Sequence, residues 1–171
     1  MPAREGSGMK EFDDYRGLLA GSVVFQHLSP AELDPVLAAA AVIARRPGEL
    51  ILSEGTPGDG LYIVLEGEIE VFLPERAAGG ARRPTRVRLN RLGPGRCLGE
   101  YALIDDQPSS ASAAALTPAR LCFLPKAEFR RLVERHDRVG RVVYANLLRY
   151  LVSRLRGKDR DLDLIVLDEK R

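Results

Sequence analysis

The apolar residues change their spacing twice along the chain. Between Ser29 and Ala41 they recur every three or four positions, as on one face of a helix. From Val42 to about Leu124, short apolar segments with partial alternation are separated by glycine and proline. After Pro125 the helical spacing returns. This order predicts a mainly β unit with one helix before it and further helices after it.

The predicted N-terminal helix has a recognisable start. Ser29-Pro30-Ala31-Glu32 has the form of a capping box, with a hydroxyl at the cap, proline at the first helical position and a glutamate three residues after the serine. Residues 1–21 mix glycine, serine, proline and charged residues without a period. We therefore expect a flexible leader before the folded unit.

Six segments of the central region have strand character. They are Glu49–Leu52, Leu61–Leu65, Glu68–Leu73, Val87–Leu92, Ser112–Leu116 and Arg120–Leu124. The turn residues between them come at intervals of a few to about a dozen residues, which is typical of an antiparallel sandwich or barrel. Glu66-Gly67 is predicted to be a two-residue hairpin turn.

Two helices are predicted between Pro125 and about Arg156, and Asp137 can cap the longer one. A second apolar seam on the longer helix follows steps of four, three and four residues, through Tyr144, Leu148, Leu151 and Leu155. Such a seam either packs within one domain or joins two copies in a homodimer. Residues 157–171 are charged and then apolar, and an added strand, a docking peptide and disorder all remain open for this tail.

Composition limits the partners. The 171 residues fit one domain, and 26 basic against 24 acidic residues leave a net charge of +2, so nothing indicates nucleic acid or an anionic membrane as the main partner. Cys97 and Cys122 are too few and too far apart for a disulfide scaffold, which favours a reducing cytoplasm. No apolar run approaches the roughly 20 residues of a membrane span, so we expect no membrane contact.

Motifs for catalysis and metal binding are absent from the sequence. His27 and His136 have no second ligand at metal-site spacing, and no Gly-x-Ser-x-Gly or GxxxxGK[ST] motif occurs. We therefore expect no catalytic residue, no metal, no cofactor and no enzyme activity.

The stretch from Gly99 to Ser112 has an order of residues that suits a small anionic ligand. A short helical turn that begins at Gly99-Glu100 leaves its first amides without intrahelical partners, and such amides favour a phosphate. The Glu100 carboxylate is an acceptor suited to sugar hydroxyls. A plain turn that links two strands is the alternative.

Two motifs resemble one known family. Glu54–Val71, with its spaced glycines, and Gly99–Ile104 are similar to the cyclic nucleotide-binding domains of bacterial catabolite-type regulators, protein kinase A regulatory subunits and cyclic-nucleotide-gated channels. The resemblance covers about residues 22–156. It implies an antiparallel, jelly-roll-like β-roll of eight strands over about 42–124, with one helix before it and two helices over about 125–156.

The resemblance also implies a ligand, which would be cyclic AMP, another cyclic nucleotide or a related anionic nucleotide. Glu100 would bind the ribose 2′-hydroxyl, and Gly99, Tyr101 and Ala102 would offer backbone contacts to the ribose and the cyclic phosphate. Ser110 stands where many members have a phosphate-binding serine or threonine. The family's phosphate-binding arginine is replaced by Ser109, which cannot neutralise charge.

Three interpretations of Ser109 remain open. Ser109, Ser110 and nearby amides could form an uncharged, weak anion nest. A cation could instead come from an inserted loop, Pro74 to Pro84, with Arg82 and Arg83 as candidates, although such charge runs usually face water. Third, the domain could be a ligand-independent protein-interaction or dimerisation module with an unidentified partner.

The resemblance assigns the longer C-terminal helix a role as lid and output, through the seam of Tyr144, Leu148, Leu151 and Leu155. Only about fifteen residues follow Arg156, too few for a helix-turn-helix domain, so we expect no direct DNA binding by this sequence.

Overall fold

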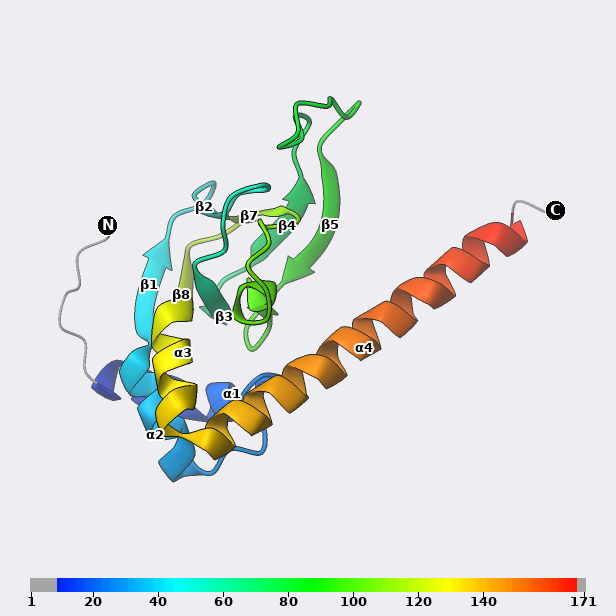
Figure 1. The fold of residues 1–171 in the computed structure, drawn as a ribbon. Coiled ribbons are helices and arrows are strands. Elements are labelled where there is room, and N and C mark those ends of the chain that lie inside the picture. Colours follow the sequence, from blue (N-terminus) through cyan, green and yellow to red (C-terminus); the bar gives the residue numbers. More distant parts are fainter. Residues whose placement is uncertain (1–8, 169–171) are drawn as a thin grey trace.

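The computed structural model describes residues 9–168, with side chains for residues 10–157. Figure 1 shows a β-roll with short helices at one end and a long helix that leaves from the same end. The helical elements are η1 (Met9–Tyr15), α1 (Arg16–Ala20), α2 (Pro30–Ala39), η2 (Glu100–Leu103), α3 (Lys126–Arg135) and α4 (Asp137–Asp168). None of these helices is long and apolar enough to cross a membrane.

Eight strands form two four-stranded antiparallel sheets, which confirms the predicted β-roll. The first sheet has the order β1 (Ala41–Arg45), β8 (Ala119–Pro125), β3 (Gly60–Glu66) and β6 (Cys97–Leu98). The second has the order β2 (Leu50–Leu52), β7 (Ser112–Ala115), β4 (Ile69–Leu73) and β5 (Val87–Leu92). The sequence did not reveal β6, because two residues are too short to show an alternating pattern.

The predicted hairpin at Glu66-Gly67 is wrong. The strands on either side of this turn, β3 and β4, belong to different sheets and do not pair. Gly67 has a φ of 82°, and a Cβ added there would lie 2.4 Å from the carbonyl oxygen of Pro118. The glycine is therefore needed for a tight corner between sheets, which has the same composition as a hairpin turn.

Strand β3 is buried on both faces and divides the core in two. Leu61 and Ile63 contact a cluster that contains α2, α3 and α4, whereas Tyr62 and Val64 contact the cluster between the two sheets. Strand β7 opposite contributes only a serine and three alanines. These small side chains leave space between the sheets at that end of the roll.

The expected flexible leader is wrong for residues 9–21. Residues of η1 and α1 pack into the core, where Phe12 is 1% and Leu19 is 0% exposed. The elements are too short to show a helical period, which is why the sequence did not indicate them. The first part of the proposed leader, 1–8, lies outside the described residues.

The capping box of α2 is confirmed, since the Ser29 amide donates to the Glu32 carboxylate at 2.8 Å. The helix predicted to end near Arg156 instead continues as α4 to Asp168, so most of the separate tail expected over 157–171 is helical; residues 169–171 lie outside the description. Cys97 and Cys122 are buried free thiols.

Candidate functional site

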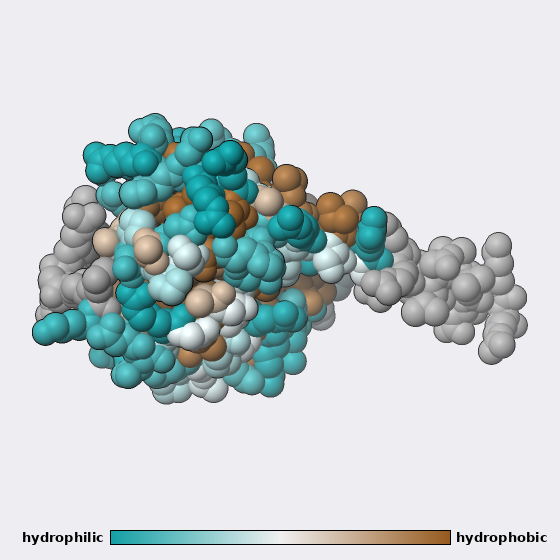
Figure 2. Space-filling model, turned by 90° about the horizontal axis from the view of Figure 1, so that it is seen from below, coloured by the Kyte–Doolittle hydropathy of each residue, from teal (hydrophilic) through white to brown (hydrophobic). Residues whose placement is uncertain are grey.

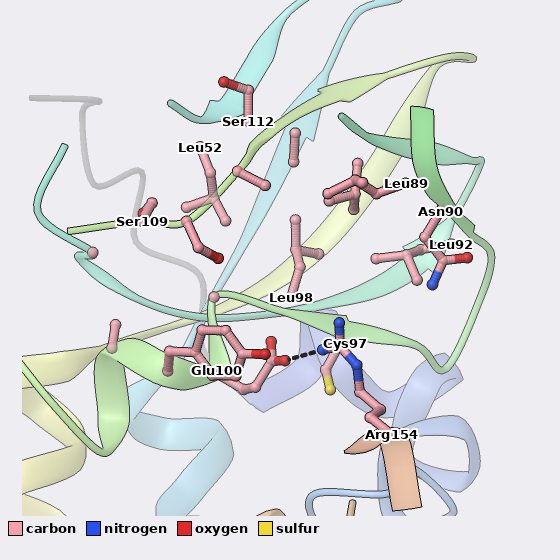
Figure 3. A pocket seen from close by; sticks show the side chains of 18 of the residues that line it. Leu52, Leu89, Asn90, Leu92, Cys97, Leu98, Glu100, Ser109, Ser112 and Arg154 are labelled. Atoms are coloured by element: carbon pink, nitrogen blue, oxygen red, sulfur yellow. Dashed lines mark hydrogen bonds and ion pairs between the residues drawn. The ribbon is translucent and has the colours of Figure 1, made fainter. Parts of the chain in front are cut away.

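A cavity of about 450 Å³ opens between the second sheet, η2 and the middle of α4 (Figure 3). Its apolar wall comes from strands on both sheets, with Leu52, Val71, Leu89, Leu92, Leu98 and Ala113. Its polar side comes from η2, the loop that follows it and α4. The small residues of β7 make this space available, since larger side chains there would fill it.

All six residues predicted to bind a ligand line this one cavity, namely Gly99, Glu100, Tyr101, Ala102, Ser109 and Ser110. They come from the start of η2 and from the loop that leads into β7. The structure therefore brings the six predicted residues together, and their role in binding stays a prediction.

Gly99 directs the chain into η2. Its φ is 74°, and a Cβ at this position would lie 2.5 Å from the carbonyl oxygen of Gly60. Only glycine fits this close approach to β3 without displacing the backbone. The turn that follows directs Glu100 inward, and this residue is only 4% exposed.

The buried Glu100 carboxylate has a partner on α4. Arg154 Nη1 donates to Glu100 Oε1 at 2.6 Å, and Figure 3 shows this contact at the lower edge of the cavity. Burial raises the pKa of Glu100 above its ordinary value, and the guanidinium offsets only part of that effect. The arginine bonds one oxygen, so the carboxylate keeps acceptor capacity for a hydroxyl group.

Arg154 was missed in the sequence. Its guanidinium carbon lies 6.0 Å from the centre of the Tyr101 ring and 5.6 Å from that of Tyr150, so two aromatic faces flank it. A charged residue on a long helix is usually assigned to solvent. The available signal was its helical spacing from the buried Val143 and Leu147, which places it on the inward face of α4.

Ser109 is the residue that the resemblance places at the family's arginine position, and its backbone is already bonded. Its amide donates to the carbonyl of Thr56 and its carbonyl accepts from the amide of Gly55, each at 2.8 Å. The amide of Ser109 is therefore not available to an anion. The side chain lies at the cavity, as Figure 3 shows.

The structure does not bring the candidate cations Arg82 and Arg83 to the cavity wall. Nη1 and Nη2 of Arg83 donate to the Glu54 carboxylate, at 2.9 and 2.8 Å, and Nη1 also donates to the carbonyl of Pro74. Among the residues that line the cavity, the charged ones are Glu100 and Arg154, and their charges cancel.

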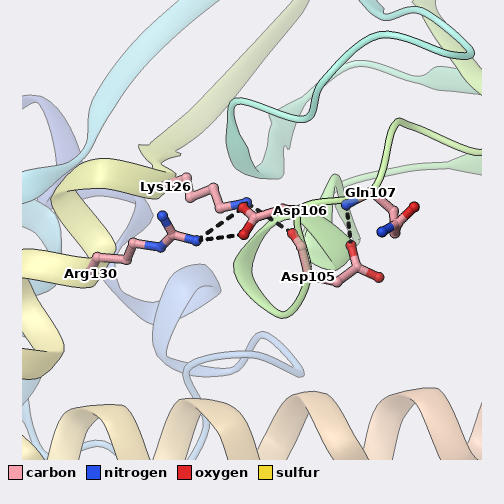
Figure 4. Close-up of polar contacts among 5 residues, drawn as sticks. All are labelled: Asp105, Asp106, Gln107, Lys126 and Arg130. Carbon is pink, nitrogen blue, oxygen red and sulfur yellow. Dashed lines mark hydrogen bonds and ion pairs between the residues drawn. The ribbon is translucent and has the colours of Figure 1, made fainter.

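The loop after η2 is attached to α3 through Asp106 (Figure 4). Lys126 donates to its carboxylate at 2.5 Å and Arg130 at 3.0 Å, and Lys126 also bonds the carbonyl of Asp105 at 2.9 Å. The Lys126 contact lowers the pKa of Asp106. One wall of the cavity is thus linked to α3 and another to α4.

The seam residues do not line the cavity. Tyr144, Leu148 and Leu155 are 37%, 61% and 60% exposed, while Leu151 is half-buried. Figure 2 shows apolar side chains, in brown, gathered where α4 leaves the β-roll.

Comparison with known proteins confirms the resemblance. Residues 43–136 match the family model of the cyclic nucleotide-binding domain. The chain is 33% identical over 153 residues to the Cyclic AMP receptor protein of Thermus thermophilus and 32% identical over 119 residues to the cAMP-dependent protein kinase regulatory subunit of Emericella nidulans. These matches cover 90% and 70% of this chain.

The solved cyclic nucleotide-binding domain from Methylobacillus flagellatus superposes with a TM-score of 0.76 at 26% identity, and 92% of each chain is covered. By contrast, the chain spans 66% of the Thermus protein and 27% of the Emericella protein. Both relatives are therefore longer than the part that this chain matches.

We predict that the stability difference between Glu100→Gln and the original protein depends on pH. The folded state raises the pKa of Glu100 above its ordinary 4.5, so ionising this carboxylate costs stability as the pH rises through and above 4.5. The variant has no such group. Its stability relative to the original protein should increase from pH 4 to pH 7, as measured by urea unfolding at each pH.

Glu75→Gln is a suitable control, because this exposed carboxyl lies on the β4–β5 loop and the comparison removes the same charge. If the stability of Glu100→Gln relative to the original protein instead decreased from pH 4 to pH 7, the bond to Arg154 would outweigh the cost of burying the carboxylate.

Proposed function

The chain belongs to the cyclic nucleotide-binding domain family, and we propose that it is a non-enzymatic regulatory module that binds a cyclic nucleotide or a related anionic nucleotide weakly. The observation that carries this proposal is the position of Glu100, a buried carboxylate with a free acceptor position at the edge of a cavity. A ribose hydroxyl can donate to such an oxygen. The cavity volume of about 450 Å³ lies in the range of small-ligand sites.

The two ends of the cavity suit the two parts of a nucleotide. Leucines and a valine line the wall on the β-sheets, where a base can bury its apolar faces. Gly99, Ser109 and Ser110 lie on the η2 side, where a cyclic phosphate would meet hydroxyl groups and backbone.

Weak binding follows from the charges. The cavity wall has one carboxylate and one guanidinium, which bond each other, so it offers no excess positive charge to a phosphate. A charge-assisted contact that is lost to a bound anion removes on the order of 2–5 kcal/mol of affinity. That loss converts a roughly micromolar site into a millimolar one.

The response to ligand is proposed to pass through Arg154. A hydroxyl bound to Glu100 shares the carboxylate with this arginine and so changes the strength of its attachment to α4. The ligand can shift the helix only by as much as it favours one packing over another. A single carboxylate thus connects cavity and helix, in keeping with a role for α4 as lid and output.

Calorimetric titration with cyclic AMP, cyclic GMP and cyclic dinucleotides tests the proposal. We expect millimolar binding by the original protein, a further loss of about tenfold or more for Glu100→Ala, and a gain of about tenfold or more for Ser109→Arg. Ile104→Arg is the matched control, since it adds the same charge at a 47% exposed position at the end of η2 that does not line the cavity.

The gain should be smaller in this control, because a positioned arginine bonds the phosphate and a distant one only attracts it. If neither the original protein nor Ser109→Arg gives heat at millimolar ligand, the binding function is excluded. Binding by Ser109→Arg alone would identify a site that no longer takes nucleotide.

A ligand-independent interaction or dimerisation module is the second candidate function. It is favoured by the exposed apolar seam of α4, since Leu148 and Leu155 are each at least 60% exposed on the same face. Two copies of α4 could bury these side chains against each other, as in a short coiled coil.

We expect the double variant Leu148→Glu/Leu155→Glu to sediment as a monomer and the original protein as a dimer, because buried like charges oppose association. Leu50→Glu is the control, since Leu50 is 55% exposed on β2 and away from α4. A monomer for the original protein at all concentrations tested would exclude self-association, and a dimer that survives the double variant would place the interface elsewhere.

A further inference from the structure

A second hollow, of about 440 Å³, lies where the loop between α1 and α2 meets the first half of α4. It is separate from the cavity at Glu100 and shares no residue with it. Its polar wall contains His27, Arg138, Arg141 and Arg149, and Val142 and Ala145 lie between the arginines. The side chains with charge are all basic.

These arginines are poorly neutralised within the described part of the chain. Arg138 is the one with a carboxylate partner, Glu32, whereas Arg149 donates to the amide oxygen of Asn146 at 3.2 Å. Arg141 is exposed and makes no ion pair among the described residues. Two guanidinium charges therefore face one hollow without a carboxylate, and their mutual repulsion favours a bound anion.

The loop between α1 and α2, which lines the hollow through His27, has an unusual conformation. His27 has a φ of 70°, and no other non-glycine among the described residues has a positive φ. The buried Asn146 fixes the preceding residues, because its amide donates to the carbonyls of Val24 at 3.0 Å and Gln26 at 2.7 Å. The same side chain thus bonds Arg149 with its oxygen and the loop with its nitrogen. The structure in this way sets His27 beside the arginines.

We propose that this hollow binds a small phosphate compound that carries at least two negative charges. Guanidinium groups match phosphate oxygens in a bidentate geometry, and a polyanion balances the two unpaired charges better than a single carboxylate does. The hollow is open to solvent, so a hydrated phosphate compound can reach the guanidinium groups. Free pyrophosphate and the phosphates of a nucleotide such as ADP share this chemistry. The proposal does not depend on the binding of a cyclic nucleotide at Glu100.

Calorimetric titration of the full chain with sodium pyrophosphate at low ionic strength tests the site. We expect Arg141→Gln and Arg149→Gln each to weaken binding by about tenfold, since each removes one charge-assisted contact. Arg76→Gln is the matched control, because it removes the same charge from an exposed position on the β4–β5 loop. This loop lies at the opposite end of the β-roll from α2 (Figure 1). The control should change affinity by less than about twofold.

Titrations with ADP and with a hexaglutamate peptide identify the source of the anion. Tighter binding of ADP than of pyrophosphate would support a nucleotide as the natural source, and the reverse order would support a free polyphosphate. No heat with pyrophosphate, an equal loss in Arg76→Gln, or binding of hexaglutamate alone would overturn the proposal. Circular dichroism of each variant keeps a folding defect from being mistaken for lost binding.

Discussion

The contact between Glu100 and Arg154 joins the β-roll to the long helix α4. Glu100 belongs to the β-roll and is held in place by the tight turn at Gly99, while Arg154 belongs to the long helix that leaves the roll. The carboxylate is buried at the edge of the cavity, so its charge needs a partner, and α4 supplies it. Any ligand that bonds Glu100 must share the carboxylate with the helix.

The rest of the structure supports this arrangement. The small side chains of Ser112 and Ala113 on β7 leave space for the cavity, and leucines of the two sheets form its apolar wall. The loop after η2 is fixed to α3 by Asp106. Strand residues therefore form one side of the cavity, and the other side is bonded to α3 through Asp106 and to α4 through Glu100. Because Ser109 supplies no charge, the proposed binding and its proposed coupling to α4 both rely on the Glu100 carboxylate.

The sequence predicted most of the β-roll, since the alternation and turn residues of strands such as β4 and β5 are long enough to read. It also placed Gly99, Glu100 and Ser109 in one site, because the motif around them is local. The prediction from sequence failed where the structure depends on contacts between residues that are far apart in the chain. The corner at Gly67 has the composition of a hairpin, and η1 reaches the core through isolated residues such as Phe12. The partner of Glu100 is separated from it by 54 residues and was invisible without the packing of α4.

Hydrogen exchange of α4 gives the most direct test of the central claim, that Glu100 transmits ligand binding to the helix through Arg154. The comparison uses Ser109→Arg, saturated with the cyclic nucleotide that binds it best, with and without the additional change Arg154→Gln. The account predicts that ligand alters exchange of the backbone amides over residues 147–157 in the first protein and leaves them unchanged in the second, although both bind. An equal change in the two proteins, or no change in either, would contradict it.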